Sequence, residues 1–334
     1  MKKYNIALIG CGHMGQAHLE HIYSKDNVCV SYVCDRDENR ARDFQRRFGA
    51  KKICTDAFTC ISAADVDIVI LATYPSSHVE LLKLCLQHKK HVICEKPIAK
   101  TPEEGEVFVR LVKENPDVKV LVGYILRHNV TYQKVAQMIQ DGAIGKPIAM
   151  RMTQNHHTME WGRYRRLLEE TPPIVDCGVH YLDVMQWFTG ATVTHMSGVG
   201  LRTEDDLPEG RNNYEMVNVR LSDGSVGFYE AGWTKTIASD NTKEFIGPLG
   251  SIRLIFAKDR TSHQEEGDLI EYYELATKTY HSINVRAERK PTDLQLEYLL
   301  RMIEEDAPAC PTIDEVYSSF QAAWRAEQQI NHCK

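Results

Sequence analysis

The sequence predicts an α/β protein, with a doubly wound parallel sheet in its first part and a larger, mostly antiparallel sheet in its second. Three observations support this prediction. Short apolar runs alternate with amphipathic stretches up to about residue 125, a glycine-rich segment follows the first run, and longer alternating runs begin after about residue 145. Near-continuous apolar runs are typical of strands buried on both faces, whereas alternation is typical of strands with one face in solvent.

The first part contains five predicted strands and four predicted helices. The strands are rich in Val and Ile and cover residues 5–9, 28–34, 68–72, 91–94 and 119–124. The helices cover residues 15–23, 38–48, 77–88 and 102–113, and the last of these begins with the capping signal Thr101-Pro102-Glu103-Glu104. Repeated strand–helix units with right-handed crossovers build a doubly wound sheet.

The second part contains six predicted strands, at residues 148–155, 194–201, 215–221, 225–233, 243–246 and 251–256. Ser222-Asp223-Gly224-Ser225 predicts a hairpin, because Asp-Gly tolerates the positive φ of a tight turn. Helices are predicted at residues 179–188, 293–304 and 314–331. We therefore expect two domains, residues 1–125 and 126–334, which suits a chain of 334 residues.

Composition excludes several classes of protein. Apolar residues make up 43 % of the chain and the formal net charge is −6, so neither disorder nor nucleic-acid binding is expected. No apolar run is long enough to span a membrane, and the N-terminus lacks the features of a signal peptide. The ten cysteines form no C-x-x-C pair, and several lie in apolar runs. We expect a cytoplasmic protein whose cysteines are reduced.

The segment Gly10-Cys11-Gly12-His13-Met14-Gly15 has the spacing of a dinucleotide phosphate loop. Gly10 permits the tight turn, Gly12 lets the backbone approach the pyrophosphate, and Gly15 allows close helix–strand packing. Asp35, which lies 20 residues after Gly15, is expected to bind the adenosine ribose and to repel a 2′-phosphate. This favours NAD over NADP, and Arg36 weakens the preference. The alternative is a structural glycine turn with an incidental acid.

Two further segments follow predicted strands of the first part, where doubly wound folds bind ligands. The first is Ala72-Thr73-Tyr74-Pro75-Ser76-Ser77-His78, and the second is Glu95-Lys96-Pro97. A lysine at such a position is usually a solvated charge. Beside a nicotinamide, Lys96 could instead orient a substrate hydroxyl and lower the pKa of a neighbouring base.

A third segment, Asp176-Cys177-Gly178-Val179-His180, lies in the second part. Asp176 and His180 are four residues apart, so at a helix start they share one face. Histidine titrates near neutral pH and can take a proton from an alcohol as hydride leaves. Asp176 could orient this histidine or hydrogen-bond the substrate. The alternative is a capping Asp and a packed His.

Taken together and in this order, these segments resemble the glucose–fructose oxidoreductase/inositol dehydrogenase/rhizopine-catabolism (Gfo/Idh/MocA) family over nearly the whole chain. The resemblance implies an N-terminal Rossmann domain and a C-terminal α/β domain with a large open sheet. It implies an oxidoreductase that uses NAD, or NADP, to transfer hydride to or from a sugar, cyclitol or related polyol. It also implies a homodimer or homotetramer, often built through the sheet face.

The resemblance also implies roles for particular residues. Lys96 is similar to the family's catalytic lysine, and Asp176 and His180 are similar to its substrate-binding acid and general base. The cofactor-binding set then comprises Gly10, Gly12, His13, Met14, Gly15, Asp35, Arg36, Thr73, Tyr74, Pro75, Ser77, His78, Glu95 and Lys96. The substrate-binding set comprises Lys96, Tyr124, Arg127, His156, Trp161, Arg163, Asp176 and His180.

The chain departs from the family pattern at two places. Thr171-Pro172-Pro173-Ile174 stands where the family often has three glycines, and Ser76 stands where it often has Asn. Prolines restrict the backbone where glycines would free it, so this wall of the pocket is expected to differ.

Three alternatives to a simple dehydrogenase stay open. One is an enzyme that retains NAD, oxidises a glycoside transiently and eliminates a group before reduction. Another is a non-catalytic sensor of sugar or dinucleotide, although it would be expected to lack Lys96 and His180. The third is a metal site from His156 or His157 with Asp176 and His180, but adjacent strand histidines point to opposite faces. We expect no metal.

Overall fold

The computed structural model describes residues 2–260 and 266–332, which divide into two compact units. Unit 1 comprises residues 1–128 and 290–317, and unit 2 comprises residues 129–289 and 318–334. The sequence predicts a single domain boundary, between residues 125 and 126. The contacts within the structure also assign residues 290–317 to unit 1. The boundary of the functional domains stays a prediction. None of the helices in the described part of the chain is long and apolar enough to cross a membrane.

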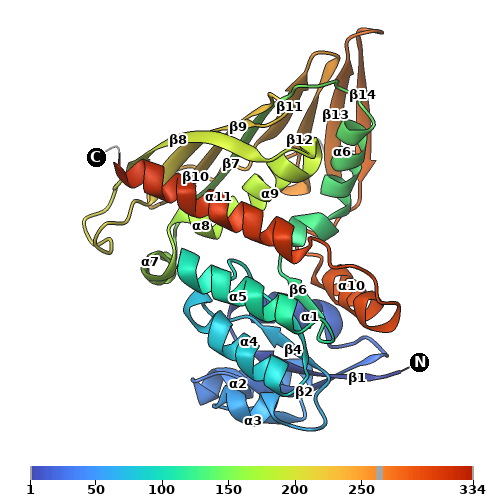
Figure 1. The fold of residues 1–334 in the computed structure, drawn as a ribbon, viewed down its shortest axis with the longest axis vertical. Coiled ribbons are helices and arrows are strands. Elements are labelled where there is room, and N and C mark those ends of the chain that lie inside the picture. The colour runs from blue at the N-terminus through green and yellow to red at the C-terminus, as the bar shows by residue number, and fades with distance from the viewer. Residues whose placement is uncertain (1, 261–265, 333–334) are drawn as a thin grey trace. The chain divides into compact units, whose positions relative to one another are not determined.

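Unit 1 is built on a six-stranded parallel sheet in the order β3-β2-β1-β4-β5-β6 (Figure 1). Its strands are β1 (Tyr4–Ile9), β2 (Val28–Cys34), β3 (Lys52–Cys54), β4 (Ile68–Leu71), β5 (His91–Cys94) and β6 (Val120–Val122). Its helices are α1 (His13–Ile22), α2 (Glu38–Phe48), α3 (Ala57–Ile61), α4 (His78–Gln87), α5 (Pro102–Glu114) and α10 (Thr292–Glu304), with short 3₁₀ turns η1 (Pro75–Ser77) and η2 (Ile125–His128).

The core of unit 1 explains why these segments form strands. Ile6, Leu8, Ile68, Ile70 and Ile93 are fully buried, as a parallel sheet covered on both faces requires. The predicted doubly wound sheet is confirmed. Strand order reverses beside β1, and the carboxyl ends of β1, β2, β4 and β5 meet at one edge of the sheet. This is the edge at which folds of this class bind ligands.

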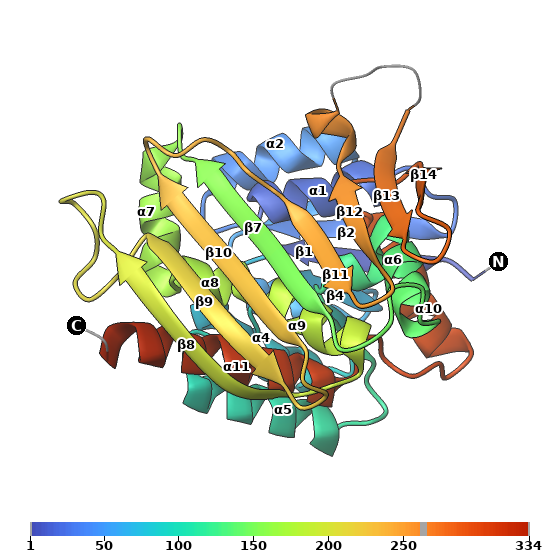
Figure 2. The ribbon, with the colours of Figure 1, turned by 90° about the horizontal axis from the view of Figure 1, so that it is seen from above.

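Unit 2 contains an eight-stranded sheet in the order β14-β13-β12-β11-β7-β10-β9-β8 (Figure 2). Its strands are β7 (Ala149–His157), β8 (Val193–Leu201), β9 (Tyr214–Leu221), β10 (Val226–Thr234), β11 (Lys243–Gly247), β12 (Gly250–Ile255), β13 (Asp268–Glu274) and β14 (Thr279–Val285). Its helices are α6 (Val130–Gln140), α7 (Trp161–Glu170), α8 (Pro173–Asp176), α9 (Gly178–Thr189) and most of α11 (Ile313–His332), with a 3₁₀ turn η3 (Ala257–Asp259).

The prediction of a mostly antiparallel second sheet is confirmed, with one parallel pair, β7 with β10. The hairpin between β9 and β10 turns at Gly224, whose φ is +86°. The sequence analysis missed β13 and β14, the small elements β3 and α3, and the helices α6 and α7. One face of the sheet carries α9, where Tyr181 stacks on Tyr229 at 4.6 Å between ring centroids.

One expectation about the cysteines is wrong. The structure joins Cys54, at the end of β3, to Cys60 in α3 through a disulfide. The other cysteines in the described part of the chain are free thiols, and most of them are buried. The apolar surroundings of the free cysteines can be recognised in the sequence. The packing of α3 against β3, which brings Cys54 and Cys60 together, cannot.

Candidate active site

The glycine loop follows β1 directly and has the backbone that its sequence predicts. Gly10 has φ +100°, and its N–H donates to the Cys34 carbonyl at 2.8 Å. A Cβ on Gly10 would lie 2.8 Å from the Ala72 carbonyl carbon, and a Cβ on Gly15 would collide with the Gly10 oxygen. Gly12, in contrast, has open space around it. The loop therefore fits a dinucleotide, because it leaves room for a pyrophosphate at the uncapped start of α1.

Asp35 is held against this loop by its own carboxylate. One oxygen accepts from the Cys11 N–H and the other from the Asp37 N–H, each at 2.9 Å. The side chain is half-buried, whereas neighbouring Arg36 is exposed. A carboxylate fixed in this way keeps acceptor capacity for ribose hydroxyls and places a negative charge beside the loop.

Lys290 is a residue of this loop region that the sequence did not reveal. Its Nζ lies 2.6 Å from Nε2 of His13 and 3.6 Å from the sulfur of Met14. The ammonium therefore adds positive charge at the start of α1, where an anionic pyrophosphate is expected. No sequence signal marks Lys290, because it is 277 residues away from His13.

The loops that follow β4 and β5 are tied together by His78. This side chain is fully buried, with Nδ1 at 3.0 Å from the Pro97 carbonyl and Nε2 at 3.2 Å from the Thr73 carbonyl. Ser77 donates to the Thr73 hydroxyl at 2.7 Å. Tyr74 and Ser76 are exposed, and Pro75 is buried. The predicted segments 73–78 and 95–97 thus form one connected edge of unit 1.

Glu95 anchors the residue before Lys96. Its carboxylate is buried and lies 2.8 Å from Nε2 of His18 in α1. Burial alone would raise the pKa of Glu95, but the hydrogen bond from His18 and the charges of His18, Lys96 and His78 lower it overall. Glu95 is therefore ionised, and half-buried Lys96 extends from a rigid strand end.

Tyr124 and Arg127 are buried, whereas residues that line an open pocket face solvent. Tyr124 is buried and its hydroxyl donates to the Val316 carbonyl at 3.3 Å. Arg127 is also buried, and its guanidinium lies 3.2 Å from a Glu315 oxygen. Both residues therefore hold η2 against the start of α11, and substrate contact by either stays a prediction.

Asp176 and His180 lie one helical turn apart at the junction of α8 and α9. Their neighbours Val175, Cys177 and Val179 are buried, whereas Asp176 and His180 are half-exposed. The His180 N–H donates to the Cys177 carbonyl at 3.1 Å, so the helical spacing continues across the junction. The two candidate side chains therefore share the accessible side of this turn. Pro172 and Pro173 form the start of α8, which explains how they replace glycines here.

Glu215, in β9, holds this turn through a hydrogen bond to its backbone. Its Oε2 accepts from the Ile174 N–H at 2.8 Å, and the side chain is fully buried. Burial, together with the neighbouring carboxyl of Glu327, raises the pKa of Glu215 well above its usual range. The surroundings of Glu215 therefore favour its neutral form. Sequence reasoning missed it because it reads as an ordinary strand residue.

The remaining predicted substrate residues lie at the end of β7 and in α7. Half-buried His156 packs near Tyr164, which contacts Trp233. Trp161 donates through Nε1 to Asp206 at 2.8 Å, and Arg163 lies 3.8 Å from Glu160. Among the residues that the structure describes, no group of three potential metal ligands contains His156, His157, Asp176 or His180.

Fold and site define the class of protein. The strand order of unit 1, the glycine loop and Asp35 form an NAD-binding Rossmann domain, and the matching family model is described as an oxidoreductase family with this fold, over residues 4–124. A model of the GFO/IDH/MocA C-terminal domain matches residues 132–253. The chain belongs to the Gfo/Idh/MocA oxidoreductase family.

Relatives with known activities share about a quarter of their residues with this chain. Myo-inositol 2-dehydrogenase of Thermotoga maritima is 26 % identical over 249 residues, 74 % of each chain. Scyllo-inositol 2-dehydrogenase (NAD⁺) of Bacillus subtilis is 27 % identical and covers 74 % of this chain and 72 % of its own. The structure of myo-inositol 2-dehydrogenase from Lactobacillus plantarum has a TM-score of 0.82 at 19 % identity, over 100 % of this chain and 98 % of its own.

The Glu215 carboxyl predicts a pH-dependent stability. A raised pKa in the folded state means that its stabilising contribution is complete below the unfolded pKa, near 4.5, and is lost as pH rises toward the folded value. Glu215→Gln keeps an acceptor for Ile174 but does not titrate. We expect the melting temperature of the variant, relative to wild type, to rise between pH 5 and pH 9 in calorimetry.

Glu244→Gln, in β11, removes a carboxylate that pairs with Arg151 at 2.8 Å; it is the matched control and should show no such trend. A constant difference between Glu215→Gln and wild type across this range would contradict the protonated state of Glu215.

Proposed function

We propose that this chain is an NAD-dependent dehydrogenase that transfers hydride to or from a hydroxyl-bearing carbon of an inositol or a related polyol. The observation that carries this proposal is the presence of two features in the same chain. One is a dinucleotide loop with a carboxylate fixed beside it, and the other is an accessible Asp–His turn on a buried support. The names of the relatives, inositol 2-dehydrogenases and a D-apiose dehydrogenase of Paraburkholderia graminis, support this substrate class.

Unit 1 provides the residues that would hold NAD. The N–H groups at the start of α1 and the Lys290 ammonium would bind the pyrophosphate, and Asp35 would accept from the ribose hydroxyls. Thr73, Tyr74 and Pro75 would line the same strand edge. NAD, when bound, supplies the hydride acceptor. Because Asp35 is fixed by two backbone N–H groups, its charge stays in place and would repel a 2′-phosphate.

His180 would be the general base and accept the proton of the reacting hydroxyl. Its position on a helix turn with buried neighbours limits its motion, which keeps a base oriented toward substrate. Asp176, on the same side of the turn, would accept a hydrogen bond from a substrate hydroxyl. Lys96 would donate to the reacting oxygen, and its charge would stabilise the developing alkoxide. Roles for Tyr124, Arg127, His156, Trp161 and Arg163 in binding are part of the same proposal.

A substrate screen tests the activity. We expect that inositols, aldoses and related polyols, offered with NAD and then NADP, include a compound that causes stoichiometric accumulation of reduced nicotinamide. Absorbance of the reduced cofactor is the measurement. Glycoside cleavage with no net accumulation of reduced nicotinamide would indicate the NAD-retaining alternative, and binding without any conversion would indicate a sensor.

His180→Ala tests the proton-transfer role. A positioned base contributes about 10²–10⁴-fold, so turnover should fall by about that factor while NAD binding is retained. Steady-state kinetics and NAD titration are the measurements. His195→Ala, at an exposed position of β8, is the matched control and should behave as wild type. Turnover of His180→Ala within twofold of wild type would remove His180 from the mechanism.

Asp35→Ser tests the cofactor preference. Loss of a charged hydrogen-bond acceptor should weaken NAD binding at least about tenfold, and loss of the repulsion should narrow the gap between NAD and NADP. Dissociation constants from fluorescence titration provide the measurement. Asp43→Ser, on the exposed side of α2, is the control. A wild-type protein that binds NADP more tightly than NAD would contradict the assignment of Asp35.

A further inference from the structure

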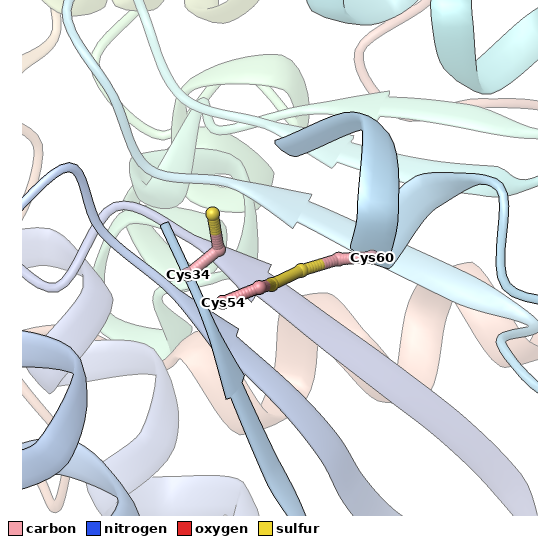
Figure 3. A group of neighbouring side chains, drawn as sticks. All are labelled: Cys34, Cys54 and Cys60. Atoms are coloured by element: carbon pink, nitrogen blue, oxygen red, sulfur yellow. A yellow bond between two sulfur atoms is a disulfide. The ribbon is translucent and has the colours of Figure 1, made fainter. Parts of the chain in front are cut away.

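Three cysteines lie together at the edge of unit 1 that carries Asp35 (Figure 3). Cys34 is the last residue of β2, Cys54 is the last residue of β3, and Cys60 lies in α3. Their sulfur atoms are within 4.8 Å of one another, and a disulfide joins Cys54 to Cys60. Neither the Rossmann fold nor the proposed hydride transfer requires a cysteine at any of these positions.

This cluster is connected to Asp35 through the backbone. Cys34 directly precedes Asp35, and the Asp35 N–H donates to the Cys54 carbonyl at 3.3 Å. The Asp35 carboxylate in turn accepts from the Cys11 N–H of the glycine loop. The chain of contacts therefore runs from the disulfide through one backbone hydrogen bond to the acid beside the dinucleotide loop.

The disulfide joins two short elements at the edge of the sheet of unit 1. β3 has three residues, lies at the edge of the sheet and pairs only with β2, through Tyr32, Val33 and Cys34. α3 has five residues, and Asp56 caps its start. The bond spans six positions in sequence, and cross-links over short loops contribute least to global stability. Its main effect is therefore local, on the position of β3 relative to α3.

The three sulfurs differ in their access to reagents. Cys54 is half-buried, whereas Cys34 and Cys60 are buried. Burial, with the charges of Asp35 and Asp56, raises the pKa of the Cys34 thiol to about 12. Cys34 is therefore a protonated thiol that does not attack the neighbouring disulfide at neutral pH. Of the three residues, Cys54 is therefore the most accessible to an external thiol.

We propose that Cys54 and Cys60 form a reversible thiol–disulfide site that reacts with low-molecular-weight thiols and sets the affinity of unit 1 for NAD. In reduction, an external thiolate attacks Cys54, the Cys54–Cys60 bond breaks, and Cys60 takes a proton. A second external thiol then attacks the mixed disulfide and releases the Cys54 thiol and an external disulfide. Two electrons and two protons pass to the protein, and the external disulfide reverses the reaction.

Reduction frees β3 from α3 and weakens the support of the Asp35 backbone by the Cys54 carbonyl. The reduced protein therefore binds NAD more weakly than the oxidised protein. The effect on affinity rests on the proposed contact of Asp35 with NAD, whereas the redox chemistry of the cysteines does not. The competing interpretation of the cluster is a site for a thiophilic metal. Two sulfurs joined in a disulfide provide no thiolates, and the group of potential ligands among the described residues comprises three cysteines, whereas structural zinc sites have four ligands.

The experiment equilibrates the full-length chain in glutathione buffers from reducing to oxidising. Alkylation and mass spectrometry count the thiols at Cys54 and Cys60, and titration gives the NAD dissociation constant at each buffer ratio. We expect these two thiols to disappear together on oxidation and NAD to bind about fivefold more tightly, the worth of one modest hydrogen bond. Cys54→Ser and Cys60→Ser should each bind NAD as weakly as the reduced wild type, with the same dissociation constant at every glutathione ratio.

Cys29→Ser, at a half-buried free cysteine in β2, is the matched control and should respond to the buffers as wild type does. Three outcomes would overturn the proposal: thiols at Cys54 and Cys60 at every buffer ratio, an NAD affinity that ignores their oxidation, or zinc bound to these cysteines in the purified protein. A wrong assignment of Asp35 can be told apart from a failure of the redox proposal. Asp35→Ser is measured in one fixed buffer, and this exchange leaves the number of thiols at Cys54 and Cys60 unchanged.

Discussion

The parallel pairing of β1 with β2 and β4 is the constraint on which the rest of unit 1 depends. Because parallel strands end at the same edge, this pairing, together with that of β4 with β5, gathers Gly10, Asp35, the segment after β4 and Lys96 from positions spread over almost ninety residues. Each of these segments is then fastened by a short-range contact: Asp35 to the Cys11 N–H, and the loop after β4 to Pro97 through His78. The strand order brings the segments together, and these contacts fix their orientation.

Unit 2 reaches a comparable result by a different route. A broad sheet with one parallel pair supports α8 and α9, and the turn with Asp176 and His180 lies where these two helices meet. The contact between Glu215 and the Ile174 N–H binds that turn to β9. Two prolines stand at the start of α8 and restrict the backbone angles there. Rigidity around Asp176 and His180 therefore comes from both the sheet and the local sequence.

The sequence predicted those parts of the structure whose signals are local. The strands of unit 1 are buried on both faces, so an apolar run such as residues 68–71 is sufficient to identify each one. β14 was missed because most of its side chains are exposed, and β3 because it is short and incompletely buried, unlike the equally short β6. Lys290, His18 and Glu215 were missed for another reason. Each acts through a partner far away in sequence, and no periodicity or motif records such a contact.

Both units bury a carboxyl group beside a proposed functional residue, and they compensate for its burial in opposite ways. Glu95, which precedes Lys96, stays ionised because His18 hydrogen-bonds it and nearby positive charges lower its pKa. Glu215, which accepts from the Ile174 N–H, has its pKa raised by burial and by Glu327, and the charge of Arg211 does not offset this. A buried charge without a partner is far more costly than a buried neutral acid. The support below Lys96 therefore rests on a carboxylate hydrogen-bonded by His18, whereas at the support below Asp176 burial favours the neutral form of the carboxyl.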